Sequence, residues 1–289
     1  MKRLLLPLLF SVVFLACHRE AAPAPPPAEY AQWRARRLAN LTKEDGWLTL
    51  VGLDWLKEGA NEVTLPAKPP ATIQATLDHG KVTLAPSPAL TIDGKRVEAP
   101  VQLRDDNDAQ GPTIVALGTI RFYAIKRNDR YGFRVRDLAS DARTKFAGLD
   151  YFPYDPKYRV EAKWVPYNPP RAIPITNVLG MTGNETSPGR LVFTLDGKEY
   201  SVDPILEQGE TDLFLIFRDE TAGKETYGAA RYLYASPPGP DGKVVVDFNK
   251  AYNPPCAFTA FATCPLPPAQ NKLPVRITAG EKKYAGGHA

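Results

Sequence analysis

The pattern of hydrophobic and polar residues changes after the first 45 residues. Within residues 29–45, four apolar side chains recur at helical spacing: Tyr30, Trp33, Leu38 and Leu41. This spacing, with arginines between the apolar positions, predicts one amphipathic helix. We expect its aromatic side to pack on a sheet, and a place on a membrane surface is the alternative.

From residue 46 onward the pattern favours β-strands. Residues 47–56 are apolar on both alternating faces, which predicts a strand that is buried on two sides and bent at Gly52. Weaker strands are separated by proline and glycine, and they fall near 72–77, 81–84, 89–92 and 113–118.

Two hairpins follow from their turn residues. Residues 121–136 form two apolar runs joined around Asn128-Asp129, and Asp196-Gly197 suits a type I′ turn inside RLVFTLDGKEYSV. The run near 213–217 is expected to pair with TYGAARYLYA, and another strand covers 244–248.

These elements predict a mainly β fold, a sandwich or distorted barrel of antiparallel strands with one N-terminal amphipathic helix. Because no internal repeat or flexible linker interrupts the chain, we expect one mainly β domain over residues 29–284 and a short tail at 285–289. A division near residue 150 is the alternative.

The N-terminus has the features of an export signal. Residues 1–16 join a charged start to an apolar run of thirteen residues, which is shorter than the roughly 20 residues of a membrane span. The run ends at Cys17 in a sequence that resembles a lipobox, and residues 17–28 form a Pro/Ala-rich tether. We therefore predict a lipoprotein anchored at Cys17 and facing the periplasm or cell surface. A secreted protein and an uncleaved anchor are the alternatives.

The segment from Asp247 to Leu273 is the most distinctive part of the chain. It holds five prolines, which restrict helix and interior strand, so a rigid loop is expected. With Cys17 lipidated, two of the three cysteines remain, Cys256 and Cys264, eight positions apart. Export favours a disulfide between them. Free buried thiols and a metal or redox pair are the alternatives.

Polar residues around this loop form the candidate ligand-binding site. Alternation along VVVDFN places Asp247 and Asn249 on the same face of a strand. Arg231 lies between apolar residues on a predicted strand, and a buried arginine in such a place is usually paired with a carboxylate. The partner would be Asp219 or Asp247. The proposed binding residues are Arg231, Asp247, Asn249, Asn253, Asn271 and Glu281. A structural ion pair with turn-capping asparagines is the alternative.

Other residues exclude several classes of function. Of the three histidines only His79 lies in the body of the chain, in a predicted exposed turn, so a histidine-dependent hydrolase is disfavoured. Nucleotide and zinc motifs do not occur, so no cofactor and no metal site is predicted. The formal net charge of +4 falls to +2 after removal of residues 1–16, which gives no reason to expect a nucleic-acid partner.

Two further groups of residues have open interpretations. The hairpin at 121–136 is rich in arginine; a solvated face is expected, and anion or lipid-headgroup binding is the alternative. The tryptophans are expected in the core, with sugar-binding platforms as the alternative: Trp33, Trp47, Trp55 and Trp164.

Several segments are similar to one protein family. They are GWLTLVGLDWL, RFYAIKRNDRYGFRVRD, FAGLDYFPYD, TYGAARYL and the long tail DFNKAYNPPCAFTAFATCPLPPAQNKLPVRITAGEKKY. Over about residues 30–284 the chain resembles the domain-of-unknown-function 1684 family, whose members are mostly bacterial and often exported. The resemblance implies that the proline-cysteine loop and the AGEK tail belong to one shared architecture. It implies no catalytic residues.

These observations predict an envelope lipoprotein that acts as a binding or interaction module for a small polar or glycan ligand. An alternative is a carboxylate-dependent, glycosidase-like hydrolase in which Asp247 and Glu281 divide acid and base roles. A structural envelope protein is the third reading. The sequence leaves open whether the protein is an enzyme.

Overall fold

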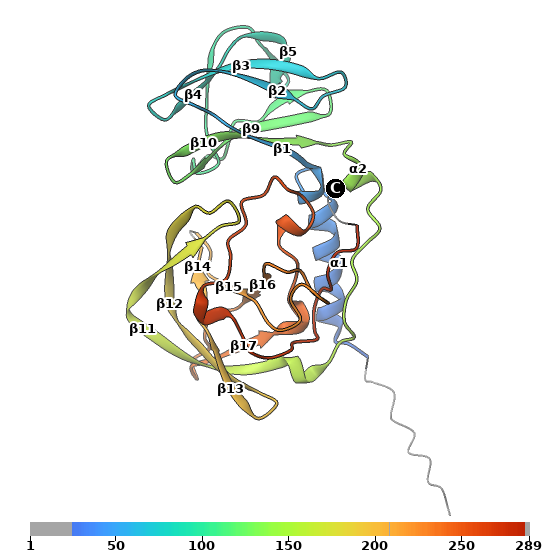
Figure 1. Cartoon of the computed structure of the whole chain (residues 1–289), viewed down its shortest axis with the longest axis vertical. Coiled ribbons are helices and arrows are strands. Elements are labelled where there is room, and N and C mark those ends of the chain that lie inside the picture. Colours follow the sequence, from blue (N-terminus) through green and yellow to red (C-terminus); the bar gives the residue numbers. More distant parts are fainter. Residues whose placement is uncertain (1–24, 208, 287–289) are drawn as a thin grey trace, which may run out of the picture.

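The protein consists of two β-rich lobes and one long helix, seen in a computed structural model (Figure 1). The structure describes residues 25–207 and 209–286. The predicted signal peptide 1–16 and Cys17 therefore lie outside the described residues, as does the first part of the predicted tether. In the described part of the chain, no helix has the length and apolar character needed to cross a membrane.

The N-terminal lobe contains two antiparallel sheets. A six-stranded sheet has the order β1-β10-β9-β8-β5-β6 and a four-stranded sheet the order β2-β3-β4-β7. The strands are β1 (Leu50–Trp55), β2 (Gly59–Leu65), β3 (Ala71–Asp78), β4 (Lys81–Leu84), β5 (Ser87–Ile92), β6 (Lys95–Val97), β7 (Val101–Leu103), β8 (Val115–Leu117), β9 (Ile120–Arg127) and β10 (Arg130–Asp137).

The two sheets of this lobe share one core, because apolar side chains from both face inward. Leu65 and Leu84 come from the four-stranded sheet, and Phe122 and Phe133 come from the six-stranded sheet. Strand β1 has an irregular register between Leu50 and Gly52, where the sequence predicts a bend. Residues 47–49 form a 3₁₀ turn, so the strand is shorter than predicted.

The C-terminal lobe is built from a curled four-stranded sheet, β13-β12-β11-β17, and a three-stranded sheet, β14-β15-β16. The strands are β11 (Arg159–Thr176), β12 (Thr182–Leu195), β13 (Lys198–Val202), β14 (Ile205–Leu206), β15 (Leu213–Phe217), β16 (Arg231–Ala235) and β17 (Lys243–Asp247). Phe193, Phe217 and Phe248 meet in the core of this lobe. The irregular C-terminal segment fills the inside of the half-barrel (Figure 1).

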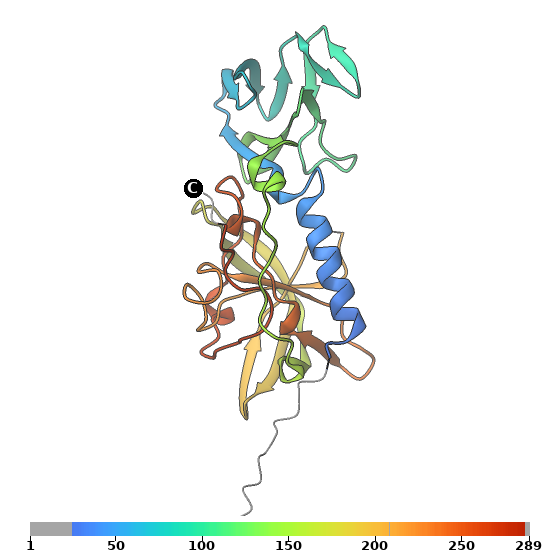
Figure 2. The same cartoon turned by 90° about the vertical axis from the view of Figure 1, so that its right-hand side faces the viewer.

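Helix α1 (Ala28–Thr42) runs along the C-terminal lobe and leads into β1 of the N-terminal lobe (Figures 1 and 2). Tyr30 and Leu41 are buried as predicted, but Leu38 is 44% exposed. Its neighbour Arg37 faces the lobe in its place and reaches Glu281. A second, short helix is α2 (Asp141–Thr144).

The predicted fold class is confirmed: the structure is mainly antiparallel β with one long N-terminal helix. Both hairpins have the predicted turns, since Asn128 (φ 53°), Asp196 (φ 49°) and Gly197 (φ 74°) adopt positive φ. Strands β15 and β16 pair as expected. Each lobe has its own core, and the single domain and the division near residue 150 both stay predictions.

Candidate functional site

Arg231 is held by an internal ion pair. It lies 1% exposed on β16, and its Nη2 is 3.0 Å from the carboxylate of Asp219. The same guanidinium donates to the carbonyl oxygens of Ile277 and Ala279. Burial lowers the pKa of Arg231, and the charge of Asp219 acts against that shift. Of the two partners predicted for this arginine, the structure has Asp219.

Asp247 and Asn249 do not continue the strand together, because β17 ends at Asp247. Asp247 begins a 3₁₀ turn and accepts hydrogen bonds from the backbone and side-chain nitrogens of Asn249 at 3.1 and 3.0 Å. Asn249 is bonded through its side chain to both backbone groups of Asp155. The predicted alternation fails here, since Val245 is 42% exposed whereas Asn249 is fully buried.

Asn253 and Glu281 belong to a second internal network. Glu281 is fully buried. Its carboxylate accepts hydrogen bonds from Arg37 Nε at 2.7 Å and from the backbone nitrogen of Asn253 at 2.8 Å. The side chain of Asn253 donates to the carbonyl oxygen of Lys282. Burial alone would lower the pKa of Arg37, but the charge and the hydrogen bond of Glu281, with smaller contributions from nearby tyrosines, raise the net pKa.

Asn271 fastens the loop to the sheet. Its side-chain oxygen accepts from the backbone nitrogen of Asp203 at 2.8 Å, and its nitrogen donates to the carbonyl oxygens of Asp203 and Ile216 at 3.0 Å. Each of the six residues predicted to bind a ligand is thus bonded inside the fold, and none of them lines the large cavity of the molecule.

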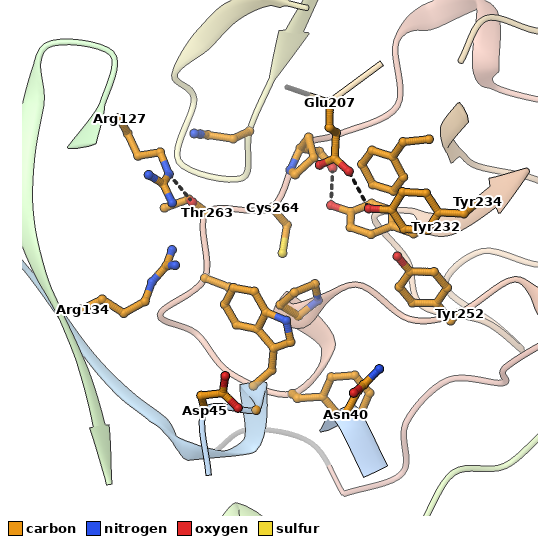
Figure 3. A pocket seen from close by; sticks show the side chains of 18 of the residues that line it. Asn40, Asp45, Arg127, Arg134, Glu207, Tyr232, Tyr234, Tyr252, Thr263 and Cys264 are labelled. Atoms are coloured by element: carbon orange, nitrogen blue, oxygen red, sulfur yellow. Dashed lines mark hydrogen bonds between the residues drawn. The ribbon is translucent and has the colours of Figure 1, made fainter. Parts of the chain in front are cut away.

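That cavity lies between the two lobes and has a volume of about 890 Å³. Helix α1 and the turn after it, the β9–β10 hairpin, β11, β12, β16 and the cysteine loop all contribute to its wall. Binding pockets for small molecules usually measure roughly 300–1,000 Å³ and often occur where two units meet. The cavity is therefore the best candidate for a ligand site (Figure 3).

Arginines form one side of the cavity. On β10, Phe133 and Val135 face the core of the N-terminal lobe, so the alternate residues Arg134 and Arg136 face the C-terminal lobe. Both are buried, at 5% and 8% exposure. The expectation of a solvated basic face is therefore wrong for these two arginines.

Arg136 and Arg127 are bonded within the protein. Arg136 donates to the carbonyl oxygen of Gly46 at 2.6 Å and to Thr49 Oγ1 at 3.1 Å. Arg127 forms a two-point ion pair with Asp106, with its Nη2 2.8 Å from Oδ2. Neither arginine depends on a ligand for its partners.

Arg134 differs from both of its neighbours. Within residues 25–207 and 209–286 its side chain has no hydrogen bond and no carboxylate within 4.0 Å, and its buried Nε has no partner. Its guanidinium lies 5.3 Å from the ring centre of Trp47 and points into the cavity (Figure 3). A cation in this state is a binding group for an anion.

Aromatic rings and Glu207 form the other side, and Glu185 also lines the cavity. Tyr232, Tyr234 and Tyr252 line the wall, with the rings of Tyr234 and Tyr252 stacked at 15°. Tyr234 donates to Glu207 Oε2 at 2.6 Å. Burial, together with the charge of Glu207, raises the pKa of Glu185.

The cysteine loop closes the cavity between these sides, and Cys264 Sγ points into it (Figure 3). Cys264 Sγ accepts a hydrogen bond from the backbone nitrogen of Cys256 at 3.1 Å. Contact with the Cys264 thiol lowers the pKa of Cys256, whereas burial raises the pKa of Cys264. Both are free thiols in this structure, so the predicted disulfide stays a prediction.

Metal-ligand geometry occurs in one surface cluster of the described residues, Glu58, Asp78 and His79. All three are exposed, and His79 lies in a turn with φ 46°, as predicted. Its Nδ1 is 2.6 Å from Asp78 Oδ1, which raises the pKa of His79. Exposed acidic groups are common without a metal, and we assign no ion here.

Sequence reasoning missed the cavity because its residues are spread along the chain. The one available signal was the arginine-rich hairpin, for which anion binding was the alternative interpretation. The tryptophans were expected in the core, yet all four are half-buried, and Trp33 and Trp47 line the cavity.

Comparison with known proteins gives a family. The model of the family described as "Protein of unknown function (DUF1684)" matches residues 144–282. The chain belongs to this family. Among proteins with curated descriptions, none matches.

An uncharacterized protein of Haloarcula marismortui, solved by solution NMR, is 35% identical. The similarity covers 48% of this chain and 78% of that one, with a TM-score of 0.41.

The DUF1684 segment supplies only part of the cavity. Residues 144–282 include Glu185, Glu207, the tyrosines and the cysteine loop, whereas Trp47, Arg127 and Arg134 precede it. The two sides of the cavity therefore come from different parts of the chain.

Proposed function

We propose that this protein is a binding module for a small organic anion, which it holds in the cavity between the lobes. The observation that carries the proposal is the buried Arg134, whose guanidinium has no acidic partner in the described residues and points into the cavity. This retains the predicted polar-ligand module and moves its site from the loop residues to the cavity.

The physical argument is one of charge compensation. Removing a cation from water without a partner costs several kcal/mol, so such groups are normally paired. Asp219 compensates Arg231 and Asp106 compensates Arg127, but none of the described carboxylates compensates Arg134. A carboxylate or phosphate group of a ligand would offset this cost and form charge-assisted hydrogen bonds, which are stronger than neutral ones.

The walls favour an organic anion over a bare inorganic one. Trp47 lies next to the arginine, and Phe214 and the three tyrosines offer further ring surface in the same cavity. Pockets for organic ligands combine such apolar surface with a few polar groups that fix orientation. A ligand with an acidic group on an apolar body matches both features.

Binding measurements with Arg134→Gln test the proposal. Straight-chain carboxylates, short phosphate monoesters and inorganic phosphate would be titrated into the wild-type protein and followed by calorimetry and NMR chemical shifts. We expect at least one organic anion to bind, and to bind about tenfold more weakly to Arg134→Gln.

The matched control is Arg130→Gln. Arg130 lies on the same strand, is exposed, and does not line the cavity, so its replacement should leave binding unchanged. The proposal is wrong if no anion binds the wild-type protein, or if Arg134→Gln, folded by circular dichroism, binds as tightly.

The carboxylate-dependent hydrolase has less support. Asp247 and Glu281 accept hydrogen bonds inside the fold, and neither borders the cavity. A structural envelope role without a ligand would leave Arg134 without a function.

Export and lipidation remain part of the proposal on the basis of residues 1–17. Labelling of cells with a fatty-acid analogue, with Cys17→Ser as the control, should give a lipidated protein in the wild type alone. A protein that stays unlabelled would contradict the predicted anchor.

A further inference from the structure

The two sides of the cavity have opposite charge. Arg127 and Arg134 lie on one side, and Glu207 lies across the cavity among the tyrosines (Figure 3). Glu185 also lines the cavity, and burial, together with the charge of Glu207, raises its pKa. The cavity therefore has a basic end and an acidic end.

In the part of the chain that the structure describes, neither Glu207 nor Glu185 forms a salt bridge with a protein cation. Among the described residues, the carboxylate of Glu207 accepts one hydrogen bond, from the neutral hydroxyl of Tyr234. The exposed side chain of Glu185 forms neither a hydrogen bond nor a salt bridge with the described residues. Two neighbouring carboxylates repel each other unless a positive group lies between them.

The basic end provides the independent indication that a ligand belongs in this cavity. Arg134 is 5% exposed, its Nε is without a partner, and the side chain points into the same space. The unmatched positive charge and the unmatched negative charges thus face one cavity from opposite sides.

The tyrosine rings suit a positive group as well. Aromatic faces attract ammonium and guanidinium ions when the charge lies within about 6 Å of the ring centre. Arg37 already uses this contact, since its guanidinium carbon lies 4.6 Å from the ring centre of Tyr252. The stacked rings of Tyr234 and Tyr252 carry this surface toward Glu207.

We propose that the ligand is dipolar: an acidic group binds Arg134, and a protonated amine at the other end of the molecule binds Glu207 and Glu185 against the tyrosine wall. This inference rests on the proposed anion-binding function and adds the second charge. A short apolar stem would pass over Trp47 and the rings.

An amine fits this end better than a metal ion or a hydroxyl group. Divalent cations bound by protein oxygens normally take several ligands, and Glu185 and Glu207 belong to no group of three potential ligands in the described residues. A neutral hydroxyl would not offset the repulsion of two carboxylates. An ammonium ion offers three donors and one positive charge.

Two matched ligand series test the inference. The first consists of unbranched ω-amino carboxylates with two to eight carbons, and the second of the corresponding carboxylates without the amine. Affinities would be measured for the wild-type protein and for Glu207→Gln and Arg134→Gln. We expect the amine to strengthen binding about tenfold at one or two chain lengths, those that match the span of the cavity.

Glu207→Gln should abolish this gain and leave binding of the simple carboxylates nearly unchanged. The glutamine retains an oxygen that can accept from Tyr234, so the fold should persist. Glu199→Gln, an exposed site away from the cavity, is the control and should keep the gain. Arg134→Gln should weaken both series.

The outcomes separate the two proposals. If simple carboxylates bind through Arg134 and the amine adds less than about threefold at every length, the dipolar ligand is wrong and the anion-binding function stands. The dipolar ligand is also wrong if the gain survives in Glu207→Gln. If neither series binds in a manner that depends on Arg134, both proposals are wrong.

Discussion

Arg37 Nε lies 2.7 Å from Glu281 Oε1, and the two residues are 244 positions apart in the sequence. Arg37 also donates to the carbonyl oxygen of Asn253 at 2.9 Å. This ion pair joins α1 to the last part of the described chain and fixes the helix beside the cavity. Glu281 therefore has a structural role, which differs from the ligand-binding or catalytic role predicted for it.

Replacement of Glu281 should destabilise the protein strongly. Glu281→Ala leaves the largely buried guanidinium of Arg37 and the backbone nitrogen of Asn253 without their acceptor. Breaking a buried ion pair by removal of one partner typically costs about 3–5 kcal/mol. Urea unfolding should show a loss of this size.

The control is Glu161→Ala, which removes the exposed partner of Lys243 and should cost at most about 1 kcal/mol. Equal losses in the two variants would contradict the structural role of the Arg37–Glu281 pair.

Gly280 is required by its surroundings, and its replacement should be costly. It has φ 78°, and a Cβ there would meet the carbonyl oxygens of Ala251 and Phe248. Gly242 has φ 71° and open space around a Cβ. An alanine at this position therefore shows the cost of the positive φ alone, without a steric clash. We expect Gly242→Ala to cost about 1–2 kcal/mol and Gly280→Ala clearly more, as measured by thermal unfolding. A smaller loss for Gly280→Ala would refute the close packing.

Tyr227 should make stability depend on pH in alkaline solution. Its hydroxyl donates to the carbonyl oxygen of Cys256 at 3.0 Å, and burial, with the nearby thiols, raises its pKa from 10.0 to about 12. A raised folded pKa gives stability that is complete below pH 10 and is lost as the pH rises toward 12.

Unfolding in urea between pH 9 and pH 12 should therefore show a shallower decline for Tyr227→Phe than for the wild type. Identical slopes would indicate that the phenol titrates alike in the folded and unfolded chains.

We expect Cys256 and Cys264 to form a disulfide in the exported protein. Cys264 Sγ already contacts the backbone of Cys256, and in protein exported to an oxidising compartment we expect the two sulfurs to be bonded. The intact mass without reductant should then be about two hydrogens below that of the dithiol. Intact mass spectrometry of the exported protein that finds both thiols reduced would contradict this prediction.

If the bond forms, it should stabilise the fold by about 2–3 kcal/mol. Dithiothreitol should lower the unfolding free energy of the wild type by that amount and leave Cys256→Ser unaffected.

Local sequence patterns predicted the strands and turns well. The hairpin turn at Asn128 and the type I′ pair at Asp196 and Gly197 depend on a few neighbouring residues, and both formed as expected. Helix α1 was also predicted, because its apolar spacing is a local property. Pairing of Arg231 with Asp219 was one of two predicted options, since a buried arginine needs a carboxylate.

The predictions that were wrong concern residues whose contacts are made with residues distant in the sequence. Arg37, and not Leu38, lies on the inner side of α1 because it forms an ion pair there with Glu281. The sequence of the hairpin predicts that Arg134 is solvated, but the other lobe packs over this side chain and buries it. Asn249 left the strand pattern because its amide bonds to Asp155. Local periodicity contains no information about such partners.

The division of the cavity wall between two stretches of the chain has an evolutionary consequence. Glu185 and Glu207 lie within the segment that the family model matches, and Arg134, which we propose binds the anion, lies before it. Under the proposed function, mutations in the β9–β10 hairpin would change which acid is bound without any change in the family segment. Homologues that share this segment but carry different N-terminal lobes should diverge in the acid that they select.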